Sequence, residues 1–421
     1  MVNRMKVTNK KVEQLIAEGI LFAPMDGNHG EKHPKTSDYV EKGVPFILVP
    51  DLVDGTVDLD NCNYISEEQA KTLRKGFSIT GDVLFTHKAT IGKVALVDTK
   101  GYEYIILTPQ VTYYRVKDDK ILCNEYLYYY FQSHTFQETF RLFASSGGTR
   151  DYLGIVAQQK LPIIYPDIDV QKDIVGVLKN FDNLIHNNNK RIRILEQMAE
   201  NLYKEWFIRF RFPGYEDIEF DGGIPKDWKL KKVDEIGKVV AGGTPSTEIE
   251  EYWDGEIAWL TPADLADFDG VYIAKGNKNI TELGLKKSSA KMMPKNTVLL
   301  SSRAPIGYVA LSRNDICTNQ GFKSVICDEE CVTHQYLFYY FKMNKSLLEA
   351  YGSGATFLEL SAGSLKKIKI LVPSMDVQRG FSNIVNGFFE EIYSLSERNS
   401  SLKKQKDLLL PRLMSGKLAV K

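Results

Sequence analysis

The chain has 421 residues, which is too long for one ordinary hydrophobic core, so two to four domains are expected. Its 54 basic and 54 acidic residues give zero formal net charge, which argues against nucleic-acid binding over the whole surface but leaves room for one basic face. No apolar run reaches the roughly 20 residues of a membrane helix, and the start of the chain lacks the apolar stretch of a signal peptide. Five irregularly spaced cysteines argue against a disulfide framework, so we expect a cytoplasmic protein without metal or cofactor.

The first domain is expected over residues 1–170, where short apolar runs alternate with turn residues in the manner of a mixed α/β (α+β) fold with small β-sheets. A polar, basic loop near its start offers side chains that could reach base edges, although a mobile surface loop explains the composition nearly as well. The candidate contacts in this loop are Asn28, His29, Lys32 and Lys35.

The stretch "DVLFTHKATIGKVALV" (82–97) predicts a strand, a basic loop and a second strand. Its loop residues His87 and Lys88 are candidate contacts to a phosphate or a guanine, with a solvated loop cation as the alternative. A helix follows, and we interpret its aromatic run "YLYYYF" as core packing rather than base stacking. Next, a glycine-rich loop with Thr149 and Arg150 either binds a phosphate or forms a tight turn before the last strand.

A long helix is predicted over residues 171–211, because apolar residues recur at alternating spacings of four and three for several heptads. At a rise of 1.5 Å per residue, the 37 residues from Gln171 to Phe207 span roughly 55 Å, more than the core of either half requires. We therefore interpret it as a spacer rather than an independent surface helix. The seam of this spacer helix includes Ile185, Ile192, Leu195, Leu202 and Trp206.

The second domain, expected over residues 212–377, is a diverged copy of the first. "TVLLSSRAPIGYVALS" (297–312) repeats the earlier strand–loop–strand 215 residues further on, and "HQYLFYYFK" (334–342) repeats "NEYLYYYFQ" (124–132). Their order is kept while the stretches between them diverge, so one scaffold carries two different surfaces. The candidate nucleic-acid contacts of the second copy are Ser302, Arg303, Lys323 and Thr356.

A second long helix is predicted over residues 378–421 with the same heptad pattern. One asparagine interrupts each seam, and such buried polar residues fix register at some cost in stability. If the two helices pair, we expect an antiparallel pair that relates the halves by a pseudo-twofold. The seam of the second helix includes Ile392, Leu395, Leu402, Leu409 and Leu413.

These patterns resemble the specificity subunit of a type I DNA restriction-modification system over nearly the whole chain. The resemblance rests on "SGGTRDYLGIVAQQKLPIIYPDIDVQKDIV" and "GSGATFLELSAGSLKKIKILVPSMDVQRGFS", each leading into a long helix, on "LEQMAENLYKEWF" and "LLLPRLMSGKL", and on "GGTPSTEIEEYWDGEIAWLTPADL". It implies two target recognition domains that each read half of a split site in double-stranded DNA. It also implies that the helices set the unread spacer and dock two methyltransferase subunits, which restriction subunits then join.

No catalytic motif of a methyltransferase or a nuclease stands out. A nuclease could be read from Asp82 with Asp98 and Lys100, an acid followed by an acid-x-Lys pattern. This pattern is common by accident, and Thr297 replaces Asp82 in the second copy. The sequence therefore predicts a non-catalytic subunit. Two alternatives stay open: a self-sufficient nuclease or methyltransferase with fused recognition domains, and a coiled-coil scaffold that never touches DNA.

Overall fold

The computed structural model describes residues 6–144, 152–266, 268, 270–303, 305–354 and 358–418. The chain folds into two compact units, of which unit 1 comprises residues 1–184 and 401–421 and unit 2 comprises residues 185–400. Both long helices, α6 (Ile168–Tyr203) and α11 (Met375–Met414), contribute a segment to each unit. No helix among the described residues is long and apolar enough to cross a membrane.

Unit 1 contains two main sheets in the part of the chain that the structure describes. The antiparallel four-stranded sheet has the order β10 (Val94–Leu96), β9 (Val83–Thr86), β12 (Val111–Tyr114) and β2 (Met25–Asp26). The five-stranded sheet has the order β3 (Tyr39–Val40), β7 (Asn63–Ile65), β4 (Val44–Ile47), β11 (Ile105–Leu107) and β8 (Phe77–Ser78). Only the β4–β11 pair of this sheet is parallel.

Short strand pairs and helices complete unit 1. The pairs are β1 (Val7–Lys11) with β13 (Pro162–Pro166) and β5 (Leu52–Val53) with β6 (Thr56–Val57). The short helices are α1 (Val12–Ala17), α2 (Glu67–Thr72), α3 (Asn124–Gln132), α4 (His134–Ala144) and α5 (Ile155–Gln158).

Unit 2 repeats much of this path. Its described residues form a five-stranded sheet of order β17 (Gly237–Ala241), β24 (Lys323–Cys327), β21 (Val298–Ser302), β22 (Ile306–Ser312) and β19 (Tyr272–Ile273). A three-stranded sheet has the order β20 (Lys278–Ile280), β18 (Trp253–Leu260) and β23 (Cys317–Thr318). Unit 2 also contains the strand pairs β16 (Lys229–Lys232) with β25 (Lys369–Val372) and β14 (Phe220–Asp221) with β15 (Ile224–Pro225). Its short α-helices include α7 (Glu282–Lys286), α8 (His334–Met343), α9 (Lys345–Ala350) and α10 (Ala362–Lys367).

The duplication seen in the sequence is also visible in the fold. The repeated strand–loop–strand forms the antiparallel hairpin β9–β10 in unit 1 and β21–β22 in unit 2. The repeated aromatic runs lie on α3 and α8, where Tyr126 and Tyr336 are both buried in the core of their own unit. The interpretation of these runs as core packing is confirmed, as is the mixed α/β fold with small sheets.

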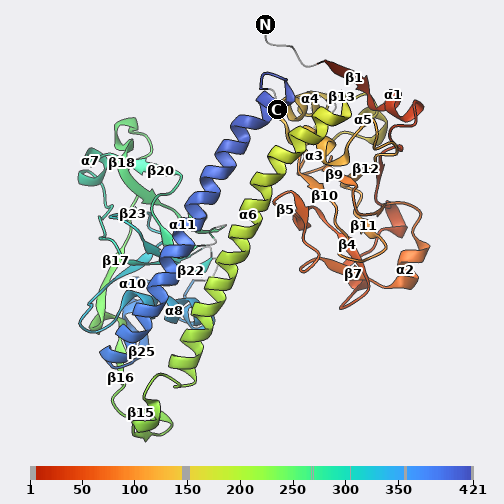
Figure 1. Ribbon diagram of the computed structural model, residues 1–421. Helices are drawn as coiled ribbons and strands as arrows, with labels where there is room; N and C mark the ends of the chain where they lie inside the picture. The colour runs from red at the N-terminus through yellow and green to blue at the C-terminus, as the bar shows by residue number, and fades with distance from the viewer. Residues whose placement is uncertain are drawn as a thin grey trace. The chain divides into compact units, whose positions relative to one another are not determined.

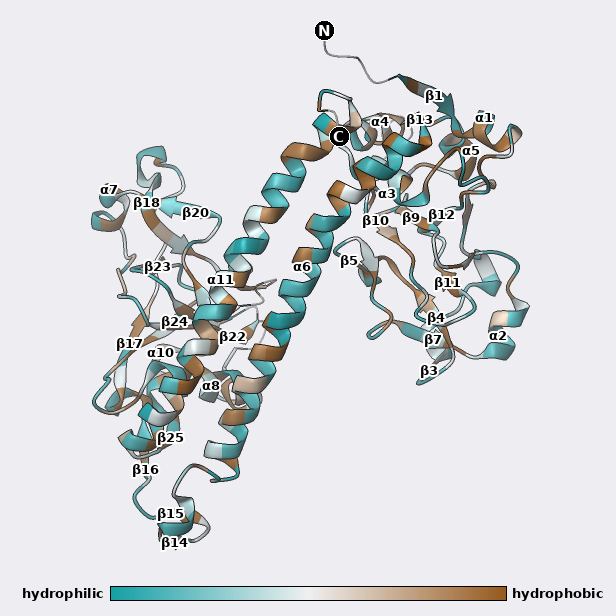
Figure 2. Cartoon of the chain, viewed as in Figure 1, coloured by the Kyte–Doolittle hydropathy of each residue, from teal (hydrophilic) through white to brown (hydrophobic). Residues whose placement is uncertain are grey.

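In each unit the segments of α6 and α11 lie side by side and run in opposite directions (Figure 1). In unit 2, Asn188 of α6 pairs with Asn399 of α11, and Trp206 of α6 lies beside Phe381 of α11. Residue numbers therefore rise along one helix as they fall along the other, which makes the two helices antiparallel. In unit 1 the pairing places Asp182 against Lys406. Figure 2 shows hydrophobic and hydrophilic residues alternating along both helices, as expected of a helix that buries one stripe.

The two seam asparagines meet within unit 2. Asn188 donates to the side-chain oxygen of Asn399 at 2.8 Å, and Asn399 donates to Asn189 at 2.6 Å. This polar layer satisfies amides that would otherwise be buried without partners, because Asn399 is almost fully buried.

The helix ends differ from the expected bounds. The predicted helix over 171–211 is α-helical over Ile168–Tyr203 and continues as a π-helical turn over Lys204–Ile208. The predicted helix over 378–421 is α11, which ends at Met414. The π-helical turn lets Trp206 and Phe207 both pack into the core of unit 2, which an uninterrupted heptad pattern does not anticipate.

A fully buried glutamine fastens each long helix to the domain before it. Gln171 accepts a hydrogen bond from the Cys123 amide at 2.8 Å and donates to the carbonyls of Ile121 and Pro166. Gln378 makes the same pattern of three contacts in unit 2. Each side chain thereby joins the start of α3 or α8, the end of the last strand and the first turn of the long helix.

Candidate nucleic-acid interface

The polar loop of unit 1 divides into buried and exposed residues. Asn28 is only 5% exposed, and its side chain donates to the Lys75 carbonyl at 2.6 Å and accepts from the Arg74 amide at 3.0 Å. Asn28 therefore shapes the loop from beneath, and our expectation that it contacts bases is not supported by its placement. Lys32 and Lys35 are exposed and remain candidates.

His29 is exposed and hydrogen-bonds through Nε2 to the Asp26 carboxylate at 2.8 Å. Asp26 is nearly buried and also pairs with Lys75. Burial by itself raises the pKa of Asp26, but the hydrogen bonds from Lys75 and His29 outweigh it and hold the pKa below its usual value. The charged Asp26 thus orients His29 at the edge of the loop.

The repeated loop of unit 1 separates its two candidates. His87 is fully buried, and its Nδ1 lies 3.0 Å from the Leu153 carbonyl. Burial lowers the pKa of His87, which favours the neutral ring. The buried ring of His87 does not face solvent here, and its direct contact with a duplex stays a prediction. Lys88 is exposed, forms a β-bridge with Tyr152, and places its amine 5.9 Å from the centre of the Tyr152 ring.

The repeated loop of unit 2 places its three candidates together. Ser302 is fully buried and donates to the Gly321 carbonyl at 3.0 Å, and its contact with DNA also stays a prediction. Arg303 is partly exposed and forms a β-bridge with Glu359. Lys323 is 8% exposed and lies on the neighbouring strand with its amine 3.3 Å from the Ser302 hydroxyl.

The two loops make the same backbone bridge, but the residue opposite the cation differs in charge. Lys88 and Arg303 occupy the same slot of the repeat, and each bridges a residue of the glycine-rich loop. That partner is Tyr152 in unit 1 and Glu359 in unit 2. Sequence reasoning missed Glu359, although its position 207 residues after Tyr152, the offset that also relates Gln171 to Gln378, marked it as the equivalent residue. Thr149, Arg150 and Thr356 lie outside the described residues.

The seam residues of the long helices face inward. Ile192 and Trp206 pack in the core of unit 2, and Leu413 packs in the core of unit 1. The other buried members are Ile185, Ile392 and Leu395, and the half-buried members are Leu195, Leu202, Leu402 and Leu409. These side chains hold the helices in place, so any partner must contact other faces of α6 and α11, where Ile194 and Met198 are about half exposed.

Asp82, the first residue of the set considered for a nuclease, has a structural role. Asp82 is 1% exposed and accepts two hydrogen bonds from the Arg115 guanidinium, both at 2.7 Å. It also accepts from the Ser78 hydroxyl and the Ile79 amide. A carboxylate enclosed by four donors is not open to a catalytic cation.

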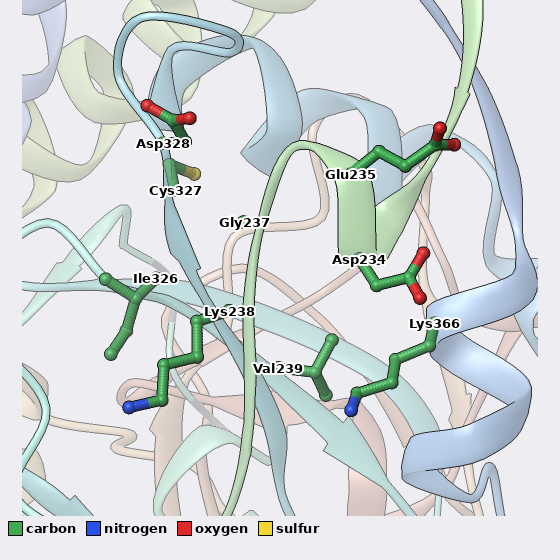
Figure 3. A pocket seen from close by; sticks show the side chains of 9 residues that line it. All are labelled: Asp234, Glu235, Gly237, Lys238, Val239, Ile326, Cys327, Asp328 and Lys366. Carbon is green, nitrogen blue, oxygen red and sulfur yellow. The ribbon is translucent and has the colours of Figure 1, made fainter.

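A shallow hollow at the edge strand β17 gathers residues of mixed charge (Figure 3). Its volume is about 610 Å³, and its lining includes the carboxylates of Asp234, Glu235 and Asp328 beside the amines of Lys238 and Lys366. Three carboxylates disfavour a phosphate backbone. The hollow therefore does not belong to the candidate interface.

Comparisons with known proteins agree with this duplicated arrangement. The family model of the "Type I restriction modification DNA specificity domain" matches residues 26–197 and again residues 225–404. The chain is 44% identical over 205 residues to the type I restriction enzyme MjaIX specificity subunit of Methanocaldococcus jannaschii, covering 47% of this chain and 46% of that protein. It is 24% identical over 443 residues to the type I restriction enzyme HindI specificity subunit of Haemophilus influenzae, covering 89% and 94%.

Among solved structures, the S subunit of a type I restriction-modification system from M. genitalium is similar with a TM-score of 0.59 and 16% sequence identity. The match covers 98% of this chain and 96% of that one. At this level of identity the match shows a shared fold.

Proposed function

Because the chain belongs to the family of type I restriction-modification DNA specificity domains, we propose that it is the sequence-specificity subunit of a type I restriction-modification complex. In this role it binds a bipartite, asymmetric site in double-stranded DNA, one half-site per recognition domain. The observation that carries the proposal is the repeated scaffold with unlike loops: the same hairpin and glycine-rich loop occur in both units, with a different partner for each loop cation.

The recognition domains are assigned to residues 1–170 and 212–377. Exposed cations supply the phosphate contacts, and side chains on the same loops read base edges. In the first domain these cations are Lys32, Lys35 and Lys88, with His29 beside them. In the second domain the cation of the matching loop is Arg303.

The long helices, assigned to residues 171–211 and 378–421, act as the spacer between the domains. Half-sites about one helical turn apart, ~34 Å, suit a reader that approaches one side of the duplex. Two methyltransferase subunits dock on the outward faces of α6 and α11, and restriction subunits then join. The subunit itself is non-catalytic and works in the cytoplasm, where its five free cysteines stay reduced.

The proposal is tested by sequencing the methylome of cells that express the intact system. A split motif is expected, and lengthening either long helix by one heptad-compatible turn should widen the gap without changing either half-site. A continuous motif, or an unchanged gap, refutes the bipartite spacer. Incubating the isolated chain with S-adenosylmethionine or divalent metal tests the enzymatic alternative, which predicts methylation or cleavage without partners.

A further inference from the structure

Two cations of unit 2 share one carboxylate. The Lys323 amine lies 3.3 Å from Glu359 Oε1 and donates to the Gln320 carbonyl at 3.0 Å. Arg303 Nη1 lies 4.0 Å from Glu359 Oε2. The Glu359 side chain is 42% exposed, while that of Lys323 is only 10% exposed. A partly exposed anion thus covers a largely buried cation.

The carboxylate is not needed to hold the loop. The backbone of Glu359 exchanges two hydrogen bonds with Ser353, both at 3.0 Å, and the next residue, Leu360, donates to the Ser302 carbonyl at 2.8 Å. These bonds fix the chain whichever way the side chain points. A change of side-chain rotamer therefore suffices to move the carboxylate away from both cations.

At the position equivalent to Glu359, unit 1 carries the neutral Tyr152. Lys88 faces the Tyr152 ring, and within the described residues no carboxylate lies at ion-pair distance from its amine. The repeat therefore keeps the cation in both copies, whereas the residue that bridges it is neutral in the first and negatively charged in the second. Unit 2 also carries a second cation, Lys323, so Glu359 faces two positive charges, whereas the residue that bridges Lys88 is the neutral Tyr152.

We propose that Glu359 occupies, in the free subunit, the place that a backbone phosphate of the duplex takes when the second domain binds its half-site. This inference rests on the proposed function. A phosphate offers the same charge and acceptor geometry to Arg303 and Lys323 as the carboxylate does. Glu359 must rotate away before the phosphate enters, so the cations are masked until other contacts compensate for that displacement.

Masking acts mainly on non-specific binding. A random duplex offers phosphates but no matching base edges, so nothing offsets the displacement of Glu359. The matching half-site supplies base contacts that do. Removing the charge of Glu359 should therefore strengthen binding to random DNA. It should also reduce the ratio between the affinity for the recognised motif and the affinity for random DNA.

The test uses the full chain in complex with its methyltransferase subunits and a random-sequence duplex of about 30 base pairs, roughly three helical turns. Fluorescence anisotropy over a salt series measures affinity and its salt dependence. Glu359→Gln keeps the shape and a hydrogen-bond acceptor, and we expect about twofold to fivefold tighter binding at low salt. The slope of log affinity against log salt should steepen by up to about one.

Three controls fix the interpretation. Glu282→Gln removes a charge from an exposed ion pair on α7 and should bind like the unmodified complex. Glu359→Asp keeps the charge and should also bind like it. In an Arg303→Gln/Lys323→Met background, Glu359→Gln should have no further effect, because the masked cations are gone.

The outcomes separate the inference from the function on which it rests. If the unmodified complex binds DNA and Glu359→Gln matches Glu282→Gln across the salt series, masking is overturned and the proposed function stands. An effect of Glu359→Gln that persists without both cations also overturns masking. If the unmodified complex shows no salt-dependent binding to any duplex, the proposed function and the inference fail together.

Discussion

Replacing Gln378 with methionine should detach α11 from the domain before it. The side chain is fully buried, accepts from the Thr333 amide at 2.9 Å, and donates to the carbonyls of Pro373 at 2.8 Å and Cys331 at 3.3 Å. Methionine has a similar length and fills the space, so the loss of hydrogen bonds dominates. At about 1 kcal/mol for each of the three bonds, the substitution costs about 3 kcal/mol.

For a unit of this size, that loss lowers the melting temperature by about 6–12 °C. Differential scanning calorimetry on the full chain measures the shift. The matched control is Gln405→Met on the same helix, because Gln405 is exposed and its side chain donates to the nearby Ser401 hydroxyl at 3.1 Å. Its expected effect is within about 0.5 kcal/mol. A Gln378→Met transition no lower than that of Gln405→Met would refute the reasoning that the buried glutamine fastens helix to domain.

Three further outcomes are expected. Asn399→Leu alone should destabilise unit 2 by roughly 1–3 kcal/mol because it leaves the Asn188 amide unpaired, whereas Asn188→Leu/Asn399→Leu should recover most of the loss in thermal melts. Burial lowers the pKa of His87 below 6.5, so the folded state resists its protonation; stability is full above about pH 6.5 and falls as the pH drops toward the lowered value. The difference between the melting temperatures at about pH 7.5 and pH 5.5 should be smaller for His87→Asn than for the unmodified chain. Asp82→Asn should cost about 3 kcal/mol in denaturant unfolding by breaking the buried Arg115 pair, and DNA cleavage by the assembled complex, measured with samples kept folded, should not change.

The sequence was most informative about features that recur along the chain, namely the heptad spacing and the two copies of the domain. Heptad spacing located both long helices, and the aligned loops located the cation slot at Lys88 and Arg303, because periodicity and duplication are properties of the chain itself. It could not show that Asn188 faces Asn399, since that depends on the register between two helices far apart in the chain. Nor could it show that His87 is buried, because loop spacing carries no sign of which side faces the core.

The two loops show which position of a duplicated recognition domain can change most easily. The cation stays in both copies, and so does the backbone bridge opposite it, while the bridging residue changes from Tyr152 to Glu359. An aromatic ring leaves the charge of Lys88 available to solvent, whereas the single carboxylate of Glu359 faces Arg303 and Lys323 and offsets one of their two positive charges. In the proposed masking, the second domain binds a backbone phosphate at this loop only where base contacts compensate for the displacement of Glu359, whereas Lys88, beside a neutral ring, meets a phosphate without displacing its bridging partner.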